Sequence, residues 1–454
     1  MSKMANTLHN GRTSPEEWEQ ISLGDIADIG TGNPAPQGEQ FFKDGIYPFV
    51  RVQDMGRLGE NKHIINTADR INQNAIGKMQ LFPKGTVLFT KSGASSLLNQ
   101  RGILKSDMYV VSHIATAIPF NGVLSEYLYY RLKIIDFNSI AHATTLPSIP
   151  LSKVYGIQIS LASSEEQKQI VNIIEEIFSD LDSAVENLKK TQEQLKTYRQ
   201  AVLKYSFEGK WKKIPMQSIS EAFGGCAFKS ANFKESGIYQ VIRIGNVRPG
   251  TMRLNISPVF LDVVEQKIID KYLLKPGDVV ISLTGTRKKR DYGYTTIVKE
   301  ENLLLNQRLA RLRFDEKCLP KFFLYYSWTQ LFKDSFFASE TGNVGQGNVG
   351  MKAIQSTEMP LPSIQEQRKI IQSIESRFSV CDKIEDSIGE NLQKAEALRQ
   401  SILKQAFDGK LTKQWRNDHK NLISNENSAE ALLERIKAEK EALKTEPKGR
   451  KKHD

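Results

Sequence analysis

An internal repeat with an offset of 200 residues constrains the fold of this chain most strongly. Residues 161–210 and 361–410 align without a gap and are identical at 17 of 50 positions. Identical pairs include Glu166 and Glu366, Gln167 and Gln367, Phe178 and Phe378, Asp182 and Asp382, Arg199 and Arg399, and Gly209 and Gly409. Self-similarity at a fixed offset is the signature of repeated structural units. The chain therefore contains a tandem duplication.

The segments that precede the two shared blocks also match, more weakly and with small gaps. Trp18 to Ile26 resembles Trp211 to Ile219, Gly45 to Val52 resembles Gly237 to Ile244, and Leu128-Tyr-Tyr130 parallels Leu324-Tyr-Tyr326. The expected domains are a first variable module (module 1, residues 1–160), a first shared block (161–210), a second variable module (module 2, 211–360), a second shared block (361–410) and a C-terminal extension (411–454). Two diverged copies of one module imply the same task performed on two different targets.

Both shared blocks have the periodicity of a coiled-coil helix. Apolar residues recur at alternating steps of three and four, which is the a/d pattern. The expected interface residues are Ile174, Ile177, Leu181, Leu188, Leu195, Tyr198 and Val202 in the first block and Ile374, Cys381, Ile384, Ile388, Leu398 and Ile402 in the second. Each helix would run about 40 residues, or about 60 Å. We expect the two helices to pack antiparallel on each other; the alternative is a core helix of a larger bundle.

The variable modules are predicted to be mixed α/β. Short β-rich runs at 45–52, 86–89, 110–117, 240–244, 279–283 and 303–312 are separated by Gly- and Pro-containing turns. Amphipathic helices are expected at 126–137 and 321–333, and a last helix at 429–443, before a basic tail. The expected fold class is α+β, with two similar mixed α/β domains joined and spaced by two long helices that form an antiparallel coiled coil.

The charge is concentrated in one segment. The chain of 454 residues has a formal net charge of +11, and residues 211–360 carry 22 basic against 14 acidic side chains. Such an excess favours a polyanionic partner. No segment has the apolar length of a membrane span or a signal peptide, so a cytoplasmic protein with no membrane contact is expected. Cys226, Cys318 and Cys381 are too far apart for a predicted zinc site or disulfide framework.

Motifs for catalysis are missing from the sequence. Gly345-Gln-Gly-Asn-Val-Gly350 satisfies G-x-G-x-x-G, but it follows no predicted strand and is interpreted as a flexible loop. Asn33-Pro-Ala-Pro36 is interpreted as a turn, no phosphate-binding P-loop is present, and the six histidines never occur at metal-ligand spacing. The sequence therefore predicts binding modules that hold no metal and bind no cofactor.

These features together resemble a known family. Each module opens on a tryptophan segment (Trp18 to Leu23, Trp211 to Met216), each closes on Leu161-Ala-Ser-Ser-Glu-Glu-Gln167 or Leu361-Pro-Ser-Ile-Gln-Glu-Gln367, and a long shared helix follows. This order is similar to that of the specificity subunits of Type I restriction-modification systems, over essentially the whole chain. The C-terminal segment Ser428 to Ile436 also resembles that family's extension, although Ala162 stands where the second copy has Pro362.

The resemblance implies the function and the partners. Modules 1 and 2 would be target-recognition domains that each read one half of a split, asymmetric sequence in double-stranded DNA. The helices would set the spacing and dock two methyltransferase (M) subunits. S-adenosylmethionine would be bound by the methyltransferase partner, and ATP and Mg by separate restriction/translocase (R) subunits, so this chain would itself catalyse nothing.

Candidate DNA-contacting residues lie in two kinds of place. Some lie in predicted loops, where a scaffold leaves side chains free to reach a ligand. Others lie at matching places on matching predicted strands, namely Arg51 with Arg243 and Ser112-His113 with Asn306-Gln307. Arginine suits phosphates and guanine, and Asn or Gln suits adenine. In module 1 the candidates are Arg51, Lys91, Ser92, Asn99, Gln100, Arg101 and His113. In module 2 they are Arg243, Asn246, Thr286, Arg287, Lys288, Lys289, Arg290, Tyr292 and Gln307.

Two other interpretations compete with DNA recognition. A coiled-coil adaptor that binds only proteins would show no salt-dependent affinity for DNA. A fused restriction-modification enzyme would transfer methyl groups as a purified chain, which requires a cofactor loop that the sequence lacks.

Overall fold

The computed structural model describes residues 14–59, 61–77, 79–92, 100–140, 148–343 and 345–445. The chain forms two compact units. Unit 1 comprises residues 1–186 and 392–454, and unit 2 comprises residues 187–391. Each unit contains one variable module together with one end of each long helix.

Module 1 is built around a five-stranded sheet in the order β2-β9-β6-β7-β4. These strands are β2 (Ala27–Thr31), β9 (Ile114–Pro119), β6 (Val87–Thr90), β7 (Arg101–Leu104) and β4 (His63–Ile64). A second sheet holds β3 (Tyr47–Val50) between β5 (Asp69–Ile71) and β8 (Tyr109–Val110). Helix α4 (Ser125–Ile134) contributes Tyr127 and Leu128 to the core, where they join Phe89 and Ala115 of the sheet.

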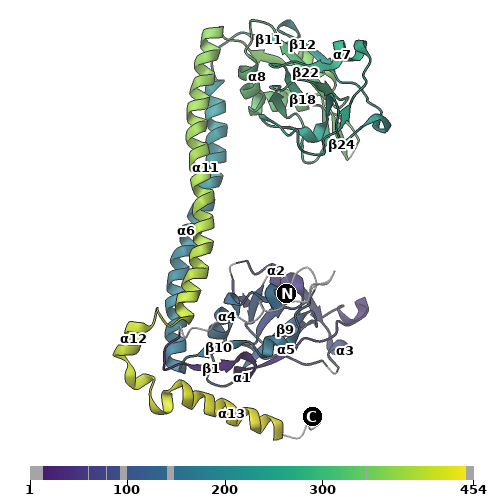
Figure 1. Cartoon of the computed structure of the whole chain (residues 1–454). Coiled ribbons are helices and arrows are strands. Elements are labelled where there is room, and N and C mark those ends of the chain that lie inside the picture. Colours follow the sequence, from purple (N-terminus) through teal and green to yellow (C-terminus); the bar gives the residue numbers. More distant parts are fainter. Residues whose placement is uncertain are drawn as a thin grey trace. The chain divides into compact units, whose positions relative to one another are not determined.

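Module 2 repeats this plan. One sheet has the order β12-β22-β18-β20 and a second has the order β16-β13-β21-β17. Their strands are β12 (Ser220–Gly224), β22 (Leu309–Phe314), β18 (Val279–Ser282), β20 (Thr295–Ile297), β16 (Phe260–Leu261), β13 (Tyr239–Ile242), β21 (Leu303–Leu305) and β17 (Leu273–Leu274). The mixed α/β character predicted from the sequence is confirmed in both modules (Figure 1).

A two-stranded ribbon closes each module before its long helix begins. In module 1, β1 (Glu19–Ser22) pairs antiparallel with β10 (Gln158–Leu161). In module 2, β11 (Lys213–Pro215) pairs antiparallel with β25 (Glu358–Pro360). The ribbon brings the start of a module to its end, so each module is anchored to the scaffold through both of its termini.

The predicted helix at 321–333 is in fact two helices, α8 (Pro320–Ser327) and α9 (Gln330–Ala338). Thr329 lies between them, and its hydroxyl accepts a hydrogen bond from the amide of Phe332 at 3.2 Å. Threonine favours this N-cap position because its side chain satisfies an amide that the helix leaves free. The break therefore results from a local cap within a continuous apolar pattern.

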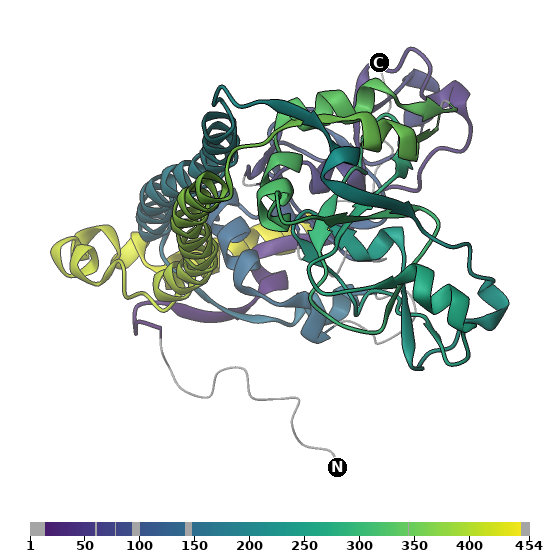
Figure 2. The ribbon, with the colours of Figure 1, turned by 90° about the horizontal axis from the view of Figure 1, so that it is seen from above.

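The long helices α6 (Ser164–Ser206) and α11 (Ile364–Phe407) pack antiparallel, as predicted (Figures 1 and 2). In unit 1, Arg399 of α11 forms an ion pair with Asp182 of α6 and lies over the Phe178 ring, 5.0 Å from its centre. In unit 2, Arg199 of α6 binds Asp382 at 2.7 Å and lies over Phe378 at 5.1 Å. An arginine, an aspartate and a phenylalanine that are identical in the two copies thus form equivalent contacts between the helices in both units.

The predicted interface is partly wrong. Ile174, Leu195, Val202, Ile374, Cys381, Ile388 and Ile402 are buried, and Ile177, Leu181 and Leu188 are half-buried. Tyr198, Ile384 and Leu398 are 46%, 38% and 48% exposed. Their neighbours Arg199 and Arg399 turn inward instead, with 21% and 12% of their side chains exposed. In these two heptads the second contact therefore comes four residues after the first and not three. The long arginine stems cover apolar surface while their charged ends pair with acids.

The C-terminal extension packs on module 1 within unit 1. Helix α13 (Ala429–Thr445) buries Leu432 and Ile436 in the module 1 core, and Lys440 binds Asp25 at 2.6 Å. Helix α12 (Lys413–Asp418) places Arg416 on the buried carboxylate of Glu166. Over the residues described, no helix has the length and apolarity needed to cross a membrane.

Candidate nucleic-acid interface

Corresponding loop segments meet at one edge of each module. The first is the turn that follows β3 or β13. Arg51 and Arg243 occupy the N-cap of a short helix, α2 (Val52–Gly56) or η6 (Ile244–Asn246). Their backbone amides donate at 2.8 Å to Asp54 and Asn246, respectively. The two arginines therefore stand at equivalent positions, as the sequence comparison indicated.

The second segment is the tight turn before β9 or β22. The amide of Ile114 bonds to Val111 and the amide of Leu309 bonds to Asn306, both at 3.0 Å. These equivalent hydrogen bonds make His113 of module 1 correspond to Arg308 of module 2, and Ser112 correspond to Gln307. The sequence alignment, which set Ser112-His113 against Asn306-Gln307, is therefore off by one residue. The alignment of α4 with α8 shifts by one residue as well. The amides of Leu124 and Leu319 donate to equivalent glutamines, so Tyr130 corresponds to Tyr325 and not to Tyr326.

A glycine supports this turn in each module. Gly32 and Gly225 lie against the backbone carbonyls of Val110 and Asn306, so a Cβ at either position would collide with main chain. Close approach of two backbones requires glycine. The framework of the turn is thus the same in both modules, and the exposed side chains on it differ.

The third segment is the basic loop after β18, which is backed by a hairpin. β19 (Thr284–Thr286) pairs with β24 (Gln346–Asn348), which pairs with β23 (Thr341–Gly342). The G-x-G-x-x-G segment is therefore partly a strand, and its prediction as a flexible loop is wrong. The strand could not be predicted from the sequence, because Gly and Asn have low β propensity and the pairing partner lies about 60 residues away.

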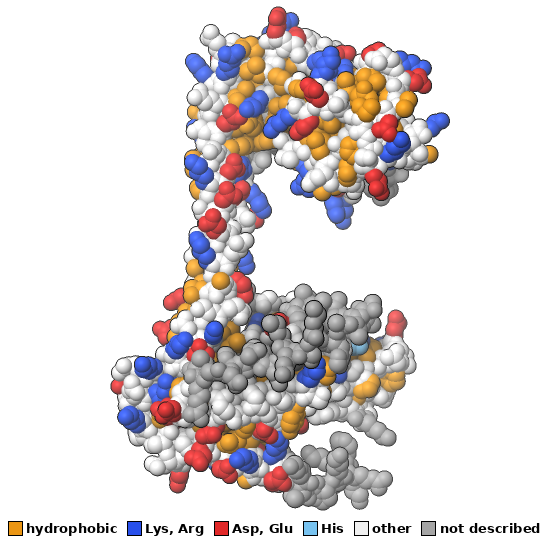
Figure 3. Space-filling model, viewed as in Figure 1, with side chains coloured by type: hydrophobic (Ala, Val, Ile, Leu, Met, Phe, Trp, Pro, Cys, Tyr) orange, Lys and Arg blue, Asp and Glu red, His pale blue; other side chains and the backbone are white. Residues whose placement is uncertain are grey.

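The four consecutive cations of this loop differ in their surroundings. Arg287 forms an ion pair with Glu340 at 3.4 Å, and Arg290 lies over the Phe337 ring at 4.7 Å, with a positive φ of 46°. Lys288 and Lys289 are exposed, and no partner for either is found in the described part of the chain. Figure 3 shows blue side chains protruding from module 2. The two lysines are thus the cations most available to a phosphate.

The module 1 counterpart of this loop is described only in part. Asn99 lies outside the described residues. Lys91 and Ser92 are half-buried, and partial burial lowers the pKa of Lys91. The Ser92 hydroxyl lies 2.9 Å from Nδ1 of His113, which joins two of the predicted residues. Gln100 is half-buried.

Three predicted contact residues are engaged inside the protein. Arg101 is 2% exposed and lies over the Phe137 ring at 4.3 Å, and burial lowers its pKa. Asn246 is 2% exposed and donates to the carbonyls of Arg253 and Ile256. Tyr292 is also 2% exposed and donates to Glu340, and burial followed by that carboxylate raises its pKa. Their side chains do not reach the surface, so none of the three belongs to the candidate interface.

Arg308 and Gln346, which are not among the residues predicted from the sequence, line a hollow of about 390 Å³ in module 2. Both side chains are exposed. The hollow is also lined by Thr284 and Thr286 of β19 and by Arg248. The correct alignment of His113 with Arg308, together with the pairing of β24, was the signal that would have revealed them.

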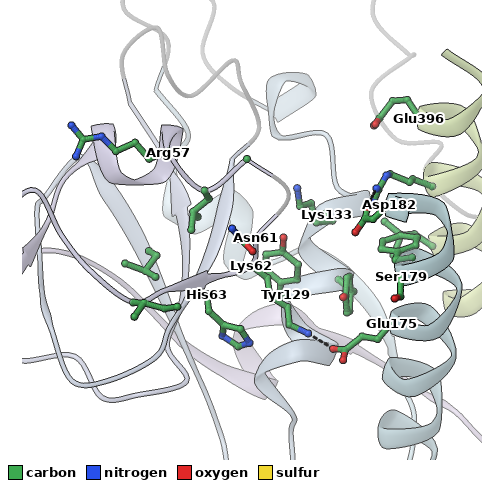
Figure 4. A pocket seen from close by; sticks show the side chains of 18 of the residues that line it. Arg57, Asn61, Lys62, His63, Tyr129, Lys133, Glu175, Ser179, Asp182 and Glu396 are labelled. Atoms are coloured by element: carbon green, nitrogen blue, oxygen red, sulfur yellow. Dashed lines mark hydrogen bonds and ion pairs between the residues drawn. The ribbon is translucent and has the colours of Figure 1, made fainter. Parts of the chain in front are cut away.

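A second type of cleft lies between each module and the helices of its own unit. In unit 1 it has a volume of about 830 Å³ and Lys62 reaches across it to Glu175 (Figure 4). The unit 2 cleft has a volume of about 980 Å³, and near it Lys321 bonds Glu375 at 2.7 Å. Burial and the Glu375 charge raise the pKa of Tyr325, another lining residue, to about 12. These contacts fix each module on its helices.

The shared Glu-Gln pair at the start of each long helix joins that helix to its module. Gln167 accepts from the amide of Leu124 at 3.0 Å, and Gln367 accepts from that of Leu319 at 2.8 Å. The Glu166 carboxylate accepts from Nε1 of Trp18 at 2.8 Å. Nothing in the described ranges groups His, Cys, Asp and Glu side chains as a metal site would.

Comparison with known proteins assigns the family. The model of the Type I restriction modification DNA specificity domain matches residues 15–197 and again 208–394. The EcoKI specificity subunit of Escherichia coli K12 is 25% identical over 96% of this chain and 98% of its own length. The MjaVIII specificity subunit of Methanocaldococcus jannaschii is 24% identical over 87% of this chain and 93% of its own.

Two solved structures share the fold. A chain from a structure of a type I R-M system has a TM-score of 0.69 at 17% identity and covers 87% of this chain and 99% of its own. The HsdS subunit of Thermoanaerobacter tengcongensis has a TM-score of 0.55 at 17% identity, with 90% of this chain and 100% of its own covered. The chain belongs to the Type I restriction-modification specificity family: it is a non-catalytic DNA specificity subunit with two target-recognition domains.

Proposed function

We propose that modules 1 and 2 each read one half of a split, asymmetric sequence in double-stranded DNA. One observation carries this proposal: the two modules share a main-chain framework at the candidate interface but present different polar side chains on it. A framework that is kept while its surface chemistry changes suits two readers with different targets. Antiparallel helices would place the readers in inverted orientation, as half-sites require under a two-fold axis.

The proposed contacts to DNA come from the exposed and half-buried polar residues at this edge. In module 1 they are Arg51, Lys91, Ser92, Gln100 and His113, and in module 2 they are Arg243, Thr286, Arg287, Lys288, Lys289, Arg290 and Gln307. Phosphate contacts position a protein on a duplex, and contacts to base edges give it specificity. Lys288 and Lys289 are assigned to phosphates, because both are exposed and unpaired among the described residues.

Docking of methyltransferase subunits is assigned to the exposed face of the long helices. Tyr198 and Leu398 occupy equivalent positions 200 residues apart and are 46% and 48% exposed. Large apolar side chains exposed on a helix pair favour a protein partner. Two equivalent exposed positions favour two copies of one partner, each an M subunit that carries S-adenosylmethionine, and the R subunits would bind ATP and Mg. This complex would work in the cytoplasm, where it meets chromosomal DNA.

The spacing role is tested by lengthening both helices. Insertion of seven residues after Leu188 and seven at the facing position of α11 would add about 10.5 Å of helix, or about three base pairs at 3.4 Å each. The methylated motif in cells that express the variant with its methyltransferase partner would keep both half-sites and gain about three base pairs between them. An insertion in α6 alone serves as the control, because it breaks the pairing and should abolish methylation. An unchanged gap in the double insertion would contradict the spacing role.

A further inference from the structure

Arg308 and His113 occupy one equivalent position in the two modules. The backbone carbonyl of His113 accepts from Lys91 at 3.2 Å, and that of Arg308 accepts from Leu283 at 3.0 Å. Both side chains are exposed at the candidate interface. The main chain at this position is thus held in the same way in both modules, while the side chain differs in charge, shape and hydrogen-bonding capacity.

Around this position, one ring nitrogen of His113 is bonded within module 1, whereas module 2 holds polar groups without a partner among the described residues. Ser92 and Thr284 also correspond. Ser92 forms a β-bridge with Ser148, and Thr284 of β19 pairs in the same way with Asn348 of β24. Ser92 bonds the His113 ring at 2.9 Å. Thr284 is 9% exposed, and its hydroxyl has no hydrogen-bond partner among the described residues although it lines the hollow beside Arg308. A buried hydroxyl without a partner costs free energy, which a ligand atom could recover.

The Arg308 guanidinium also has no partner in the described ranges. It lies between the hollow that contains Thr284 and Gln346 and a neighbouring hollow of about 570 Å³ that contains Arg243 and Gln307. A planar guanidinium offers two parallel donors, which match the O6 and N7 acceptors of guanine in the major groove. A lysine carries the same charge without that geometry.

We propose that Arg308 is a specificity-determining residue of module 2 that reads a guanine edge, and that His113 is the base-reading residue at the equivalent position of module 1. The proposal rests on the proposed function, since it requires each module to read a half-site. Gln346 and the Thr284 hydroxyl complete the polar surface around Arg308. The guanidinium and not the charge is the feature that selects the base.

The test uses the full chain in complex with its methyltransferase partner and compares methylated motifs of the wild type, Arg308→Ala, Arg308→Lys and His113→Ala. Both Arg308 variants should lose the preference for guanine at one position of one half-site, by about 5- to 150-fold in methylation rate. His113→Ala should alter one position of the other half-site only. Lys288→Ala is the matched control, and it should slow methylation of every sequence without changing the motif.

The unaltered half-site shows in each case that the variant is folded and assembled. If Arg308→Lys keeps the wild-type preference, the fork geometry of the guanidinium is not what selects the base and the inference is wrong. An unchanged motif in Arg308→Ala would overturn it as well. A wild-type motif that is not split into two halves would instead contradict the proposed function.

Discussion

Among individual residues, Lys288 and Lys289 differ from the arginines that flank them. Arg287 and Arg290 contact Glu340 and Phe337 and hold the loop in place, while the two lysines are exposed. The double substitution Lys288→Ala and Lys289→Ala should therefore lower affinity for all DNA sequences and reduce the slope of log K against log salt by about 2. Titrations of a labelled duplex at several salt concentrations measure this slope. A slope equal to that of the wild type would remove both lysines from the phosphate contacts.

Glu166 and Glu366 are identical in sequence but not in environment. Glu166 is 1% exposed and accepts from Trp18, Thr412 and Arg416, whereas Glu366 is exposed and caps its helix with Ser363 at 2.9 Å. Glu166→Ala leaves the Arg416 charge buried, which costs about 3–5 kcal/mol. Urea unfolding should show a large loss of stability for this variant and a much smaller one for Glu366→Ala. Equal losses would contradict the proposed difference.

The sequence predicted residue types at the interface better than residue roles. Arg51 and Arg243 were matched correctly because they follow similar strands. The burial of Arg101, Asn246 and Tyr292 depends on Phe137, the Arg253 carbonyl and Glu340, which no local pattern reveals. The role of Glu166 was equally hidden, since Arg416 lies 250 positions away.

At the level of elements, the helix pair depends on a repeated contact between Arg, Phe and Asp. Arg399 joins Asp182 and Phe178 in unit 1, and Arg199 joins Asp382 and Phe378 in unit 2. Arg199→Asp should destabilise unit 2, because it places a second carboxylate next to that of Asp382. The reversed pair, Arg199→Asp with Asp382→Arg, should recover about 1 kcal/mol. Recovery stays incomplete because the contact with Phe378 is lost.

Thermal unfolding of the single and double variants measures this coupling. The pair Arg399→Asp and Asp182→Arg provides the matched test in unit 1. No recovery in either double variant would mean that these ion pairs do not fix the helix register.

The existence and length of both long helices could be predicted from the sequence, because a heptad sustained over 40 residues has few alternatives. The phase of the second contact could not. Positions three and four residues after Leu195 are Tyr198 and Arg199, and both fit a seven-residue repeat. Arg199 turns inward because Asp382 and Phe378 lie at the facing position of the other helix, about 180 residues away in the sequence.

For the whole molecule, the duplication visible in the sequence becomes two recognition domains of one framework, each anchored to both long helices within its own unit. The C-terminal extension breaks this equivalence, because α13 covers module 1 and Leu432 packs against Gly122. The corresponding turn of module 2 carries Glu316 and Lys317, which are exposed. The sequence predicted helix α13, but its docking surface required the folded module.

If each module reads its own half-site, a chain that carries module 1 twice will read the first half-site twice. In this variant, residues 18–160 replace residues 211–360, so that both positions hold module 1 and both long helices are kept. Long-read sequencing of methylated DNA, from cells that express the variant with its methyltransferase partner, gives the motif. We expect a symmetric motif in which the wild-type first half-site occurs twice as an inverted repeat with the original spacing. A motif that retained the second wild-type half-site would mean that the modules do not each read their own half-site, and a direct repeat of the first would mean that the two readers are not inverted.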